Sequence, residues 1–93
     1  MPEVEQERGW DLGWLSFTNP TDGNLKVRYA YQRPTNLGIV GYDVQGRNCF
    51  SFHRRLSGQG TIGLDLTRLP EGVYLLRITE GDHQRIEKLV LLK

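Results

Sequence analysis

Hydrophobic and polar residues alternate along much of this chain, which is the pattern of half-buried β-strands. In the stretch "NLKVRYAY", every second residue is apolar or aromatic and falls on one face: Leu25, Val27, Tyr29 and Tyr31. Their neighbours Lys26, Arg28 and Ala30 fall on the other face. The chain has one alanine and no long stretch with apolar residues at i, i+3, i+4 and i+7. The pattern therefore predicts an all-β protein.

Turn signals divide the chain into short strands. Clusters rich in Gly, Pro, Asn and Asp separate the apolar segments: "NPTDGN", "QRPTN", "QGRN", "SGQG", "LPEG" and "EGDH". Short strands between such clusters are typical of an antiparallel sandwich or barrel. We expect a single immunoglobulin-like antiparallel β-sandwich of about seven strands, at residues 12–17, 24–31, 37–42, 50–54, 61–65, 73–79 and 85–92.

The first residues differ from the rest of the chain. Residues 1–11 contain too little apolar surface to join a core, so we expect a linker there and the folded domain at 12–93. Glu3, Glu5 and Glu7 stand where a secretory signal peptide would have basic residues and then an apolar stretch. The formal net charge of +1 indicates no basic nucleic-acid interface, and no apolar run is long enough for a membrane span.

Few residues suggest chemistry. Cys49 is the only cysteine, so no internal disulfide can form, and we expect it to be a small core residue. His53 and His83 have no ligand-like spacing, so neither a metal site nor a cofactor is predicted. The three serines lack the sequence context of an activated nucleophile: Ser16, Ser51 and Ser57. The sequence therefore predicts a protein that is not an enzyme.

The segment "LTRLPEGVYLLRI" indicates a sharp corner before a strand. Pro70 fixes its φ angle, and Gly72 permits an unusual backbone conformation. Tyr74 then begins a strand that is apolar on both faces. A tyrosine in this place can donate its hydroxyl back to the loop, as in the tyrosine corner of immunoglobulin-like sandwiches.

The last segment, "RIEKLVLLK", is also apolar on both faces, because Ile86 and Val90 oppose Leu89 and Leu91. A strand buried on both sides lies in the middle of a sheet or beneath a covering partner. The segment is therefore expected to be structural, a surface that a partner recognises, or both.

Four short motifs follow one another along residues 17–93. They combine turn residues or strand ends at characteristic spacing: Pro20, Gly23 and Val27; Tyr42, Asp43, Gly46 and Arg47; Leu69, Pro70, Gly72 and Tyr74; Lys88 and Lys93. In this order the motifs resemble the type A C-terminal sorting domain of cargo proteins exported by the type IX (Por) secretion system of Bacteroidetes. Two positions depart from that pattern: Gly41 replaces a large apolar residue, and Asn48-Cys49 replaces an apolar pair.

The resemblance implies a non-catalytic signal that follows a larger cargo domain. The cargo would cross the inner membrane by its own signal peptide, and the translocon would recognise the sorting domain in the periplasm. A sortase-like peptidase would then cut before the first strand, and the cargo would be released or joined to lipopolysaccharide at the cell surface. Met1 is accordingly expected to be an expression start on an excised domain, which could also form a homodimer through an edge strand.

The resemblance assigns translocon recognition to the terminal segment: Lys88, Leu89, Val90, Leu91, Leu92 and Lys93. Basic residues of the last hairpin can orient a partner while a strand edge supplies main-chain pairing: Arg77, Arg85, Lys88 and Lys93. Alternatively, the lysines only protect an edge strand against aggregation. Turn geometry alone explains four further motif residues: Pro20, Gly23, Pro70 and Gly72.

A different class of function remains open. Trp10 and Trp14, with Tyr29 and Tyr31, could form an aromatic platform on one face of the sandwich. The domain would then be an adhesive or carbohydrate-binding module. The two tyrosines share the alternating face of Leu25, however, so core packing is the preferred interpretation for them.

Overall fold

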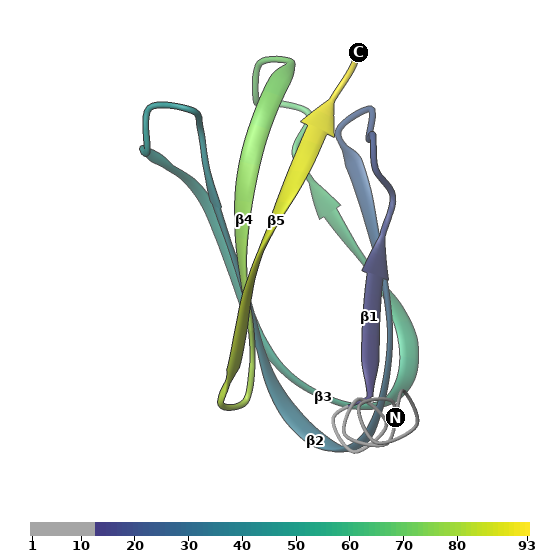
Figure 1. The fold of residues 1–93 in the computed structure, drawn as a ribbon. Coiled ribbons are helices and arrows are strands. Elements are labelled where there is room, and N and C mark those ends of the chain that lie inside the picture. The colour runs from purple at the N-terminus through teal and green to yellow at the C-terminus, as the bar shows by residue number, and fades with distance from the viewer. Residues whose placement is uncertain (1–12) are drawn as a thin grey trace, which may run out of the picture.

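The computed structural model describes residues 13–93, which form one antiparallel β-sheet. Five strands make up this sheet: β1 (Trp14–Phe17), β2 (Asn24–Tyr42), β3 (Asn48–Asp65), β4 (Gly72–Glu80) and β5 (His83–Leu91). The strands lie in the order β1-β2-β4-β5, and β3 pairs with β2 (Figure 1). The described residues confirm the all-β prediction, and they include no helix long and apolar enough to cross a membrane.

The prediction of seven strands was wrong, because β2 and β3 each contain two of them. The expected turns "QRPTN" and "SGQG" are bends inside one long hairpin, whose strands stay paired on both sides of the bend. The register shifts between Tyr31 and Thr35, and Pro34 lies within this shift. Proline has no N–H to contribute to the ladder, so a position where pairing is interrupted accommodates it.

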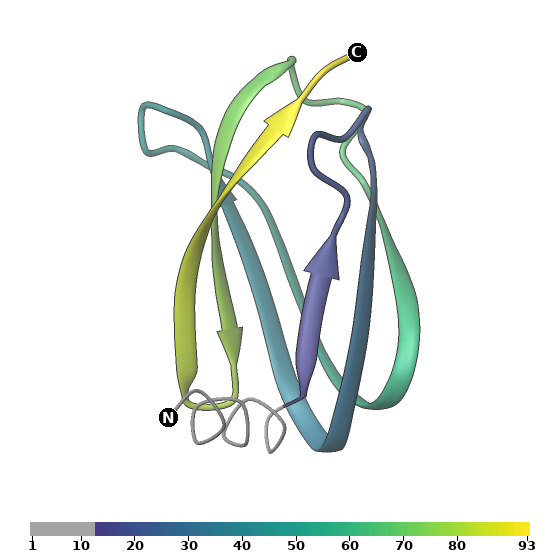
Figure 2. The ribbon, with the colours of Figure 1, turned by 45° about the vertical axis from the view of Figure 1, so that its right-hand side comes forward.

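The bend allows β2 to belong to two parts of the sheet. Its first half pairs with β1, in the register Trp14↔Ala30, and its second half pairs with β4, in the register Leu37↔Glu80. The sheet therefore curls, and both parts contribute to one core (Figure 2). Its buried members are Leu15, Leu25, Val27, Tyr31, Leu37, Ile39, Leu56, Ile62, Leu66, Tyr74, Leu76, Ile78, Leu89 and Leu91.

The aromatic platform considered from the sequence does not form among the described residues. Tyr31 is 2% exposed, and Tyr29 packs against the core with its ring stacked on that of Tyr31, 5.7 Å away. Trp14 pairs with Ala30 and so lies on the opposite face of the sheet, where it is 49% exposed. Trp10 lies outside the described residues. The core interpretation of the two tyrosines is thus confirmed for Tyr31 and in part for Tyr29.

Strand β5 does not lie in the middle of the sheet, as its composition had indicated. It is the last strand of the order β1-β2-β4-β5. Leu89 and Leu91 on its inner face are fully buried, whereas Ile86 on its outer face is 57% exposed. The expectation of burial on both faces was therefore wrong, because no other element of the described chain covers the outside of β5.

Candidate functional site: the terminal strand and its supporting turns

The four sequence motifs converge on one end of the fold. The loop before β2 hydrogen-bonds to the end of β5, and Lys93 hydrogen-bonds to the loop between β3 and β4. The β2–β3 turn and the corner before β4 line one shared hollow. These segments lie at the same end of the fold as the C-terminus, the upper end in Figure 1. Motifs that are far apart in the sequence thus gather at one end of the fold, where the loop before β2 and the loop between β3 and β4 contact the terminal strand directly.

The outer edge of β5 is covered by residues 19–21. Thr21 N donates to Val90 O at 2.9 Å, and Leu92 N donates to Thr21 O at 2.8 Å. The amide of Asn19 acts in the same way as a strand peptide group, since Nδ2 donates to Lys88 O at 2.8 Å and Oδ1 accepts from Val90 N at 3.0 Å. Asn19 directly precedes the motif residue Pro20, but the sequence interpretation did not include it.

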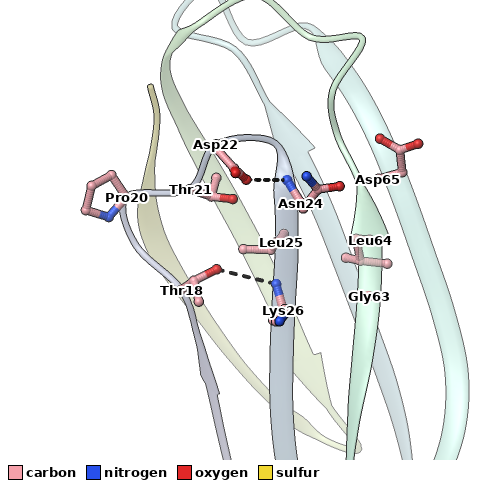
Figure 3. Close-up of a pocket in the computed structure, with 10 residues that line it drawn as sticks. All are labelled: Thr18, Pro20, Thr21, Asp22, Asn24, Leu25, Lys26, Gly63, Leu64 and Asp65. Atoms are coloured by element: carbon pink, nitrogen blue, oxygen red, sulfur yellow. Dashed lines mark hydrogen bonds between the residues drawn. The ribbon is translucent and has the colours of Figure 1, made fainter. Parts of the chain in front are cut away.

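The turn that follows this segment explains the Pro20–Gly23 spacing. Gly23 has a φ of 115°, which favours glycine, and its carbonyl accepts from Leu66 N at 2.7 Å. Asp22 Oδ1 accepts from Asn24 N at 3.0 Å (Figure 3). Val27, the last residue of this motif, is fully buried in the core. The motif thus connects the cover of β5 to the hydrophobic core.

The hollow beside this turn has no arrangement suited to catalysis. Figure 3 shows it between residues 18–26 and the end of β3. Its two carboxylates serve local turns: Asp22 caps Asn24, and Asp65 accepts from Thr67 N and Oγ1 at 3.0 and 2.6 Å. The hydrogen bonds from Thr67 lower the pKa of Asp65. Within residues 13–93, no three His, Cys, Asp or Glu side chains form a group that could hold a metal ion.

The tyrosine corner predicted from the sequence is confirmed. The Tyr74 hydroxyl donates to Pro70 O, and burial of the ring raises the pKa of Tyr74. Gly72, between them, has a φ of 153°. The corner fixes the start of β4, whose residue Tyr74 pairs with Leu89 of β5.

Asp43 organises the β2–β3 turn. Its Oδ1 accepts from Gln45 N at 2.9 Å and from Arg47 N at 3.0 Å, and Oδ2 pairs with Arg47 Nε at 2.9 Å. Gly46 completes the turn with a φ of 85°. The hydrogen bonds from Arg47 hold the pKa of Asp43 below its ordinary value.

This turn should lose stabilisation in acid. Because the pKa of Asp43 is lowered in the folded domain, Asp43 contributes fully to the free energy of unfolding above the ordinary aspartate pKa. This contribution is lost as the pH falls through the pKa of Asp43 in the folded domain. We expect Asp43→Ala to unfold more easily than the parent at pH 7 and to show a weaker loss of stability between pH 5 and 3. Urea unfolding across this range measures both effects. Asp82→Ala is the control, and an equal response of the two variants would contradict the assignment.

The departure from the family pattern at Gly41 has a steric reason. A Cβ at this position would lie 2.1 Å from Cε2 of Phe50, its partner across the β2–β3 pair. The Phe50 ring packs against the core and occupies the space that a side chain at position 41 would need. Cys49, next to it, is only partly buried against the core, so its prediction as a core residue is confirmed only in part.

The structure separates the six predicted recognition residues into two groups. Leu89 and Leu91 are in the core, and the main chain of Val90 is hydrogen-bonded to residues 19–21. Leu92 and the two lysines, Lys88 and Lys93, are exposed. Lys93 is nevertheless held in place, because its Nζ donates to Thr67 O at 2.7 Å and its N donates to Glu71 Oε1 at 3.1 Å.

Arg85, one of the basic residues considered for partner orientation, pairs with Glu80 inside the domain. Tyr31 Oη donates to Glu80 Oε2 at 2.6 Å, and Arg85 Nη1 donates to Glu80 Oε1 at 3.0 Å. Arg85 Nη2 also reaches Leu15 O of β1 at 3.4 Å. This network links β1, β2, β4 and β5 at the end of the fold opposite the motifs.

Sequence comparison identifies the family. The secretion system C-terminal sorting domain matches residues 17–92, a range that contains the three turn motifs and all but the last residue of the terminal segment. No curated protein matches the chain. Domains of this family are generally non-catalytic. The chain therefore belongs to the secretion system C-terminal sorting domain family and is a sorting signal for type IX secretion.

Proposed function

We propose that the type IX translocon recognises this domain in the periplasm and carries a preceding cargo across the outer membrane. A sortase-like peptidase then cuts before β1, and the cargo is released or remains at the cell surface. The observation that supports this proposal best is that the family motifs gather at one end of the fold, where residues 19–21 and the corner before β4 hold the terminal strand in place, since a signal needs one well-defined recognition surface. The bacterium of origin would belong to the Bacteroidetes.

The same proposal covers the finer description of the fold. The two parts of the curled sheet share one core, and Tyr74 hydrogen-bonds to the loop before its strand. Both features are typical of immunoglobulin-like sandwiches. We therefore regard the domain as a member of that class in which two long strands continue from one layer to the other.

Export of a reporter tests the function. We expect a signal peptide, a fluorescent protein and this chain, fused in that order, to reach the surface or the medium of a Bacteroidetes strain with type IX secretion. In a matched strain without the translocon, the fusion should stay in the periplasm. The exported reporter should be shorter by the mass of the domain, which gel mobility and mass spectrometry measure. Equal export by both strains would contradict translocon recognition, and retention in both would contradict the sorting function.

A further inference from the structure

The outer face of the β4–β5 hairpin remains accessible to a partner beside the terminal segment. One edge of β5 pairs with β4 along its full length, and residues 19–21 cover the other edge beside Lys88 and Val90. The inner face carries Leu89 and Leu91, which are in the core. Recognition of the folded hairpin by strand addition at this covered edge would first require the displacement of residues 19–21.

The outer face combines exposed apolar side chains with cations. Three cross-strand pairs form it: Val73 with Val90, Leu75 with Lys88, and Arg77 with Ile86. Val73 is 40% exposed and Leu75 is 44% exposed, and Ile86 is more exposed than either. Contiguous exposed apolar residues, unlike scattered ones, mark interaction surfaces. Exposure alternates along β4 although its sequence is apolar on both faces, so the sequence did not indicate which face is open.

The formal charge of this face is entirely positive. The Arg77 guanidinium lies 5.7 Å from the ring centroid of Tyr42, a residue of β2, and this cation–π contact positions it on the sheet. Lys88 is exposed in the neighbouring cross-strand pair of this face. The neighbouring outward positions of β2 are the uncharged residues Gly38, Val40 and Tyr42. The two carboxylates on the hairpin strands, Glu80 and Glu87, pair with Arg85 on the inner side. The third carboxylate of the hairpin, Asp82, lies in the turn between the strands.

We propose that this outer hairpin face docks onto an acidic protein surface with an apolar centre, supplied by the type IX secretion machinery. The inference rests on the proposed function and specifies which part of the domain is recognised and by what chemistry. Carboxylates of the partner pair with Arg77 and Lys88, which increases the association rate and fixes the orientation. Val73, Leu75 and Ile86 supply the apolar area that is buried in the complex.

The export assay tests this inference with two double variants of the outer face. Arg77→Glu with Lys88→Glu reverses the charge, and Leu75→Ser with Ile86→Ser removes the apolar contact. The matched control, Lys26→Glu with Arg28→Glu, makes the same charge change on exposed positions in the first half of β2. We expect about tenfold less export for each outer-face variant and unchanged export for the control. Lys88→Glu alone serves as a milder variant, and urea unfolding of each purified domain verifies the fold.

The outcomes separate the two proposals. If the parent fusion is not exported, the proposed function fails and this inference fails with it. If the parent and folded outer-face variants are exported equally, only the docking inference is wrong. The docking inference would also be overturned if this face had another occupant. Binding of the purified domain to phosphatidylglycerol vesicles, abolished by Arg77→Glu/Lys88→Glu, would assign the face to a lipid surface. A dimer in sedimentation that Ile86→Ser dissociates would assign it to a second copy of the domain.

Discussion

Replacement of Leu89 by alanine is expected to lower the free energy of unfolding of this domain by about 2–5 kcal/mol. Leu89 is fully buried and pairs with Tyr74, which is itself part of the core. The substitution removes buried apolar surface and leaves a cavity, because the neighbouring strands can close around it only in part. Urea unfolding of the purified chain, followed by tryptophan fluorescence, measures the loss.

Leu92→Ala is the matched control. It removes the same side-chain atoms three residues later, where the leucine is 55% exposed. We expect a change within about 0.5 kcal/mol, as for most surface substitutions. Similar losses for the two variants would show that β5 does not pack against the core as described.

The size of this effect determines how the terminal segment can be tested as a signal. A domain of this length has a total stability of about 4–12 kcal/mol, so the loss of one core leucine can unfold a large fraction of it. Deletion of residues 88–93 would remove both Leu89 and Leu91 and would therefore abolish export whether or not the segment is recognised. Variants of exposed residues are needed to separate recognition from folding.

The strand content of this domain could be predicted because alternation is a local pattern. The number of strands could not, since Gly and Pro in "QRPTN" and "SGQG" suit a bend inside a strand as well as a reversal of the chain. Only the pairing of β2 with β3 on both sides of the bend distinguishes these two cases. The tyrosine corner was predictable because Pro70 and Tyr74 are four residues apart.

The candidate site was harder to predict because its contacts join distant parts of the chain. The Asn19 side chain donates to Lys88 and accepts from Val90, residues 69 and 71 positions away, and no local pattern indicates these bonds. Apolar residues on both faces of β5 indicated burial on both sides, but five strands provide only one inner face for the core. Arg85 and Lys88 are equivalent as basic residues in the sequence, yet they lie on opposite faces of β5.

The buried network around Glu80 provides the second large expected effect. Glu80→Ala should lower the free energy of unfolding by about 2–3 kcal/mol, because Glu80 is 7% exposed and its loss removes the hydrogen-bond acceptor of Tyr31 and the buried carboxylate partner of Arg85. Arg85 is partly exposed, so water can solvate its guanidinium after the loss of Glu80. The cost in free energy of unfolding therefore stays below that of breaking a fully buried ion pair. Urea unfolding at pH 7 measures this loss.

Glu87→Ala is the matched control, because it removes a second carboxylate from the same arginine. Glu87 Oε2 lies 3.0 Å from Arg85 Nε, but its side chain is far more exposed than that of Glu80. Exposed ion pairs contribute little, so we expect a loss below about 1 kcal/mol. If Glu87→Ala were as destabilising as Glu80→Ala, burial and the Tyr31 hydrogen bond would not explain the importance of Glu80.

The same network should make the domain sensitive to alkali. Burial and the hydrogen bond to Glu80 raise the pKa of Tyr31 well above its ordinary value of about 10. In alkali the folded chain therefore keeps a proton on Tyr31 that the unfolded chain releases. The contribution of this hydroxyl to the free energy of unfolding is complete below about pH 10 and is lost as the pH rises further. The loss per pH unit approaches about 1.4 kcal/mol for one group. Tyr31→Phe should be less stable than the parent at pH 8 but should lose less stability between pH 10 and about 11.5. Parallel curves of the free energy of unfolding against pH for the two proteins would exclude Tyr31 as the group responsible.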